Sequence, residues 1–104
     1  MPKQDVSINV SVTFRNCDST EPLKAYAIDK VQSCLKKYVN GPTDARVILS
    51  VQKRDHSAEV IVHSKGYDVS GTETTADLYS SIDKVVDNIV SQLRKQKEKL
   101  VSHK

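Results

Sequence analysis

The chain has few aromatic residues, with one Phe, four Tyr and no Trp among its 104 residues. Proteins that bind single-stranded nucleic acid through its bases usually present aromatic rings on which the bases stack. A chain with so few rings is better suited to bind phosphates or the shape of a folded RNA. Because Tyr79 lies beside an apolar stripe, we expect its ring to be partly buried rather than stacked on a base.

Cysteines and long apolar runs are also scarce. Cys17 and Cys34 form no CxxC pair and cannot supply the four ligands of a structural zinc site. The N-terminus has no basic-then-apolar signal sequence, and no apolar run approaches the roughly 20 residues that span a bilayer. We therefore expect a cytoplasmic protein with free thiols, no bound metal and no contact with a membrane.

The sequence lacks the motifs of common enzyme classes. It contains no HExxH, no P-loop, no GxGxxG and no GxSxG. Asp83 and Asp87 have the spacing of a carboxylate pair on a helix, but no nucleophile or pocket accompanies them. Gly66 and Gly71 suit a turn and a close packing contact better than a phosphate-binding loop. We expect no enzyme activity, no catalytic residue, no cofactor and no small-molecule substrate.

The sequence does contain a regular succession of strand and helix patterns. Its length predicts one domain, residues 1–104. From residue 6 to residue 14, apolar and polar residues alternate, as in a half-buried strand. Thr20 can cap a helix that has Pro22 in its first turn, and Asn40-Gly41-Pro42 ends that helix.

The second half of the chain predicts three more strands and a long helix. Strand patterns cover residues 47–51, 59–63 and 67–72, joined by links of hairpin length at 54–57 and 64–66. The order β-α-β-β-β-α predicts an α+β fold with a four-stranded mixed sheet and two helices packed on one face. The first two strands are parallel because a helix connects them, and the last residues, from about 100 to 104, form a short tail.

The final helix, from about residue 75, joins an apolar stripe to a cationic cluster. The stripe has the three- and four-residue spacing of one helix face and consists of Leu78, Ile82, Val85, Ile89 and Leu93. One or two cations would offset the negative end of a helix dipole, each contributing about 0.3–1 kcal/mol. Four cations in six residues exceed that need and favour a patch for RNA or another polyanion: Arg94, Lys95, Lys97 and Lys99.

Further basic residues lie outside this cluster. Lys30 and Lys37 are seven residues apart, on one side of the first helix, where an ordinary solvated face is an equal alternative. The sequence leaves open whether the basic stretches of the two helices coincide in space. His56 and His63 have an odd spacing across one strand, which places them on opposite faces and argues against a shared metal site. Next to Lys53, His56 could contact phosphate or be a plain turn residue.

Several of these segments, in this order and spacing, resemble one known family. They are VILSVQK at 47–53, His56, His63, DLYSSID at 77–83 and QLRKQK at 92–97. The resemblance is to the ribosome hibernation promoting factor and ribosome-associated inhibitor family, also called sigma-54 modulation proteins, in its short form. It covers nearly the whole chain. The departures are Thr74-Thr75 where Glu-Gly is common, Gln96 where His or Tyr is frequent, and Ser33 where the first helix often has a second basic residue.

The resemblance implies a bacterial cytoplasmic protein that binds the small ribosomal subunit, and its 16S rRNA, in the channel used by mRNA and tRNA. Such a protein reversibly inhibits translation under stress or in stationary phase, and we expect it to be a monomer in isolation. The family pattern assigns rRNA contacts to Lys30, Lys53, His56, Lys95, Lys97 and Lys99, and charge adds Lys37 and Arg94.

Two rival hypotheses belong to other functional classes. One is a double-stranded RNA-binding or RNA-chaperone module, which can have a similar layout of strands and helix. The other is a small protein-interaction domain whose basic tail only improves solubility. Affinity for a bare RNA duplex would favour the first, and salt-independent binding to a protein would favour the second.

Overall fold

The computed structural model describes residues 7–39, 41–65 and 67–102, and its side-chain description excludes Tyr67 and residues 97–102. The elements are β1 (Ile8–Arg15), α1 (Glu21–Lys36), β2 (Thr43–Gln52), β3 (Asp55–Ser64), β4 (Tyr67–Thr75) and α2 (Leu78–Ser102). The sheet has the order β1-β2-β3-β4, with β1 and β2 parallel and the other two pairs antiparallel. The predicted element order and mixed four-stranded sheet are confirmed.

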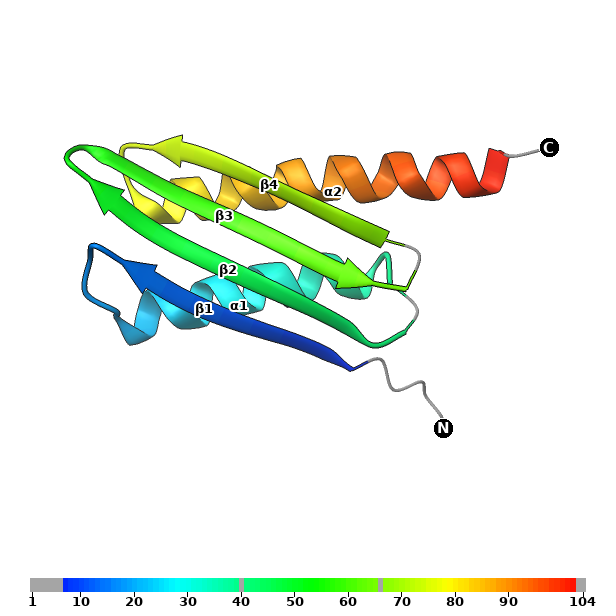
Figure 1. The fold of residues 1–104 in the computed structure, drawn as a ribbon, viewed down its shortest axis with the longest axis horizontal. Helices are drawn as coiled ribbons and strands as arrows, with labels where there is room; N and C mark the ends of the chain where they lie inside the picture. Colours follow the sequence, from blue (N-terminus) through cyan, green and yellow to red (C-terminus); the bar gives the residue numbers. More distant parts are fainter. Residues whose placement is uncertain (1–6, 40, 66, 103–104) are drawn as a thin grey trace.

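The two helices run in the same direction, as Figure 1 shows. The topology requires this arrangement. Since β1 and β2 are parallel, α1 must return against both, and β4 has the direction of β2 because two hairpins separate them. The chain then reverses again into α2. The C-terminal ends of both helices therefore lie at one end of the molecule, opposite the β2–β3 turn, and the last turns of α2 extend beyond the sheet.

The core lies between the helices and one face of the sheet. Along β2 and β3, alternate side chains such as Val47, Leu49, Val60 and Val62 are at most 1% exposed. All five residues of the predicted α2 stripe are buried, and Leu93 is fully buried. Each such aliphatic side chain contributes about 1.5–3 kcal/mol relative to an exposed one. The burial of the stripe attaches the first four turns of α2 to the sheet.

Both helices begin at a polar residue that accepts backbone hydrogen bonds. The Thr20 side chain accepts from the Leu23 amide at 3.3 Å, which confirms the predicted cap. Asp77 accepts from the Ser80 amide and from the Ser80 hydroxyl, both at 2.9 Å. These two hydrogen bonds stabilise the carboxylate and hold the pKa of Asp77 below its usual value. Asp77 therefore fixes the start of α2.

Two predicted boundaries differ from the structure. The β2–β3 turn consists of two residues, Lys53 and Arg54, so His56 lies in β3 and the predicted link at 54–57 is wrong. Lys53 has φ 58°, a left-handed conformation that the sequence does not signal because Gly or Asn usually fills such a position. At the other boundary, α2 continues to Ser102 rather than ending in a tail at about residue 100. The segment after Leu93 is rich in Lys, Gln, Glu and Arg, and it contains no Gly or Pro to stop the helix.

The two cysteines differ in environment, which leads to a first prediction. Both are free: Cys34 is buried on α1, whereas Cys17 is half-buried. Burial raises the pKa of the Cys34 thiol to about 11 from 9.0. We expect an alkylating reagent at pH 8 to modify Cys17 well before Cys34, because only the thiolate reacts. Mass spectrometry of peptides from a timed reaction measures this order. Equal rates in the folded protein, or recovery of a Cys17–Cys34 disulfide, would contradict it.

Candidate nucleic-acid interface

A cluster of four side chains joins the middle of α1 to the first two turns of α2. The Tyr26 hydroxyl on α1 donates to Asp83 Oδ1 on α2 at 2.5 Å. Lys30 Nζ lies 3.6 Å from the same carboxylate oxygen and 5.8 Å from the centroid of the Tyr26 ring. Tyr79 meets Tyr26 edge to face, with ring centroids 5.0 Å apart and an interplanar angle of 69°. Asp83 is thus the common partner that orients Tyr26 and Lys30.

The interactions among Tyr26, Lys30 and Asp83 orient these side chains but contribute little to the stability of the fold. The hydrogen bond to Asp83, together with partial desolvation, raises the pKa of Tyr26, because both favour the protonated hydroxyl that donates to Asp83. The side chains of Lys30 and Asp83 are 41% and 49% exposed. Ion pairs in such settings contribute about 0–1 kcal/mol. The Lys30 ammonium is therefore partly neutralised, yet water and a ligand can still reach it.

Two more cations lie three turns further along the parallel helices, one at the C-cap of α1 and one on α2. Lys37 follows Tyr26 by eleven residues, and Arg94 follows Asp83 by eleven residues. Eleven residues correspond to about three helical turns, or roughly 16 Å, so each cation lies on the same side of its helix as the cluster residue. Lys37 and Arg94 are both exposed. We call this track the helix-pair surface, consisting of Tyr26, Lys30, Lys37, Tyr79, Asp83 and Arg94.

The other predicted site residues lie elsewhere. Lys53 is exposed in the β2–β3 turn, at the opposite end of the molecule from the C-terminal ends of the helices. In β3, His56 Nδ1 is 3.1 Å from the Arg54 carbonyl oxygen, and the His56 carbonyl accepts from the buried Ser81 hydroxyl at 2.5 Å. Ser81 thereby ties the start of α2 to the base of the β2–β3 turn. The side chains of the predicted residues Lys97 and Lys99 lie outside the described residues.

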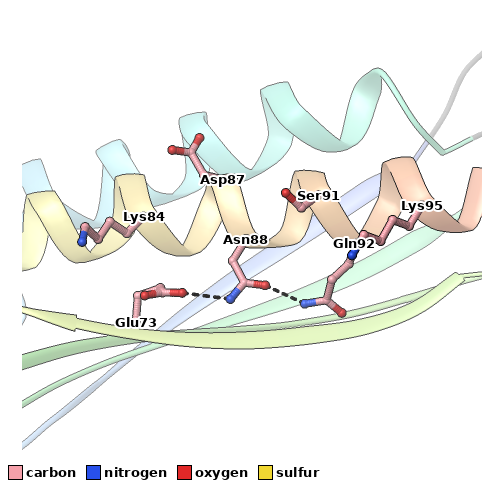
Figure 2. Close-up of a pocket in the computed structure, with 7 residues that line it drawn as sticks. All are labelled: Glu73, Lys84, Asp87, Asn88, Ser91, Gln92 and Lys95. Carbon is pink, nitrogen blue, oxygen red and sulfur yellow. Dashed lines mark hydrogen bonds between the residues drawn. The ribbon is translucent and has the colours of Figure 1, made fainter.

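Lys95 lies on a third part of the surface, beside a groove of about 450 Å³ between α2 and β4. Figure 2 shows the polar chain in this groove, in which Asn88 donates to Glu73 at 2.9 Å and Gln92 donates to Asn88 at 2.7 Å. Gln92 also donates to the carbonyl oxygen of Ser70 in β4 at 2.7 Å. These amides hold α2 against β4. Sequence reasoning missed them, although their four-residue spacing on a helix was a signal.

The glycine that faces this chain has a packing role, as expected. A Cβ atom at Gly71 would lie 2.9 Å from the Cγ and Oδ1 atoms of Asn88.

His56 and His63 are seven residues apart on β3 and occupy opposite faces of the sheet, as predicted. On the open face, His63 Nδ1 lies 2.5 Å from Asp68 Oδ1. Across the described ranges, His, Cys, Asp and Glu side chains form no group of three or more that could hold a metal ion. No helix in the described part of the chain is long and apolar enough to cross a membrane.

Fold and surface together define a small basic α+β domain with cations along a pair of parallel helices. A family-wide sequence profile, described as sigma 54 modulation protein / S30EA ribosomal protein, matches residues 10–101. The chain belongs to this family, and the resemblance inferred from the sequence is confirmed.

Individual relatives agree with this assignment. The ribosome hibernation promoting factor of Escherichia coli K12 is 28% identical over 96 residues, which cover 92% of this chain and 100% of the relative. The ribosome hibernation promotion factor of Deinococcus radiodurans is 36% identical over 95 residues, 86% of this chain and 49% of the relative. The N-terminal domain of Thermus thermophilus Protein Y superposes with a TM-score of 0.75 at 30% identity, covering 86% of this chain and 98% of that domain.

Proposed function

We propose that this chain is a bacterial ribosome hibernation factor, which binds the small ribosomal subunit in the mRNA and tRNA channel and reversibly inhibits translation. The observation that carries the proposal is the family match over residues 10–101, together with relatives that are named as ribosome hibernation factors. Such a factor would act in the cytosol, under stress or in stationary phase.

The geometry of the domain supports this function in three ways. A two-layer domain with a fully buried core needs little ordering on binding, so little conformational entropy opposes association. Cations distributed along the helix-pair surface favour fast, salt-dependent association with a site walled by phosphates. Inhibition by occupancy requires one bound protein for each blocked subunit, and it is reversed when the protein dissociates.

The residues that we propose to contact 16S rRNA fall into three groups. Lys30, Lys37 and Arg94 belong to the helix-pair surface. Lys53 and His56 would contact a second stretch of rRNA at the β2–β3 turn. The third group consists of Lys95, Lys97 and Lys99, which follow one another along the C-terminal part of α2. A binding site that surrounds the domain on several sides suits a channel better than a flat RNA surface.

The test is a competition titration on small subunits that carry labelled mRNA and initiator tRNA. We expect displacement to saturate near one protein per subunit and to be reversed by excess initiation components. Addition of the protein to vacant subunits first should block mRNA binding to the same extent. If mRNA and tRNA remain at full occupancy while the protein is bound, the channel-blocking mechanism is wrong.

A further inference from the structure

Tyr79 lies in the first turn of α2, and it is more exposed than the sequence predicts. Its relative exposure is 43%, and among the described residues it is the large hydrophobic side chain that the fold leaves exposed. Leu78 and Ile82 belong to the buried stripe, so the intervening position turns away from the sheet. A singly exposed ring is common on protein surfaces, so a role for Tyr79 rests on the groups that surround it.

The ring of Tyr79 is also held in place. It packs edge to face against Tyr26, with centroids 5.0 Å apart, and Tyr26 is in turn fixed by its hydrogen bond to Asp83. Aromatic pairs in this geometry contribute about 0.5–1.5 kcal/mol beyond the area that they bury. A ring braced in this way loses little freedom when a flat ligand stacks on it. The two helices thus hold an exposed aromatic surface at a defined position.

We propose that Tyr79 is a stacking platform for an unpaired nucleobase of the bound rRNA, an inference that rests on the proposed function. Lys30 lies 5.8 Å from the centroid of the Tyr26 ring, on which Tyr79 packs, and would supply a cation for the phosphate of the stacked nucleotide. An apolar protein partner would need a contiguous apolar patch, whereas the neighbours Ala76, Ser80 and Asp83 are small or charged. A base offers an aromatic face together with a nearby anion, which matches the ring and the ammonium group.

Two substitutions separate the ring from its hydroxyl group. We expect Tyr79→Ala to weaken binding to the small subunit by about 5- to 150-fold, the range for loss of one stacked base. The slope of log K against log salt should not change, because every cation that neutralises a phosphate remains in place. Tyr79→Phe keeps the aromatic face and should bind within about twofold of the unmodified protein. Equal binding by all three proteins, or equal losses of affinity in both variants, would overturn the inference.

A third variant reports on stacking directly. The chain contains no Trp, so Tyr79→Trp introduces its only tryptophan, whose emission is measured as the difference from the unmodified protein in the same mixture. We expect its emission to be quenched, and shielded from acrylamide, when the protein co-sediments with small subunits. Unchanged emission in the co-sedimented complex would refute the stacking even if Tyr79→Ala weakened binding through misfolding. Failure of the unmodified protein to co-sediment would instead refute the proposed function, and the stacking inference with it.

Discussion

Replacement of Lys37 and Arg94 with Ala is expected to weaken binding to the small ribosomal subunit by roughly 30-fold at physiological salt. The reason is the removal of two charge-assisted hydrogen bonds to phosphate, each contributing about 1 kcal/mol or more. The slope of log K against log salt should also become shallower, by about 0.7–0.9 for each phosphate that is no longer neutralised. Filter binding or sedimentation over a range of salt concentrations measures both effects.

A matched control comes from the open face of the sheet. Arg15 and Arg46 are exposed there, so their replacement with Ala removes the same charge without touching the helices. This control should bind with nearly the affinity and salt slope of the unmodified protein. Equal losses of affinity in the two double variants would mean that net charge alone drives binding, and that the helix-pair surface has no special role.

The second large effect concerns stability. Leu93 is fully buried at the end of the α2 stripe, and Leu93→Ala should lower the free energy of unfolding by about 2–5 kcal/mol. Arg94 is adjacent in sequence but exposed, so Arg94→Ala should change the free energy of unfolding by less than about 0.5 kcal/mol. Urea denaturation followed by circular dichroism measures both values. A small effect of Leu93→Ala would show that the C-terminal half of α2 does not depend on packing against the sheet.

Leu93 is buried and its neighbour Arg94 is exposed, and regular differences of this kind made the fold predictable from the sequence. The apolar stripe of α2 and the alternation in β1 are repeated signals, and each residue of the pattern reports the same face. Thr20 was predictable because a side-chain acceptor before an apolar helix meets a local need of the backbone. The periodic pattern that signals burial and the side chain that caps a helix each involve only a few neighbouring residues. Both can therefore be recognised directly in the sequence.

The candidate site depended on longer-range geometry that the sequence displays only in part. The parallel direction of the helices brings Lys37 and Arg94 to one end, and this follows from the relative directions of all four strands rather than from any local pattern. The orientation of the Tyr79 ring depends on Tyr26, which is 53 positions earlier in the chain. The turn at Lys53 has a positive φ without a residue that favours it. Single residues at contacts between distant segments leave no periodic signal.

The measurement that tests the central claim most directly is equilibrium binding of the purified chain to isolated small and large ribosomal subunits. Small subunits are expected to saturate at one protein each, with an affinity that falls steeply as salt rises, whereas large subunits and a bare RNA duplex should bind only weakly. Equal affinity for the small subunit and the duplex would contradict the account and support a general double-stranded RNA binder.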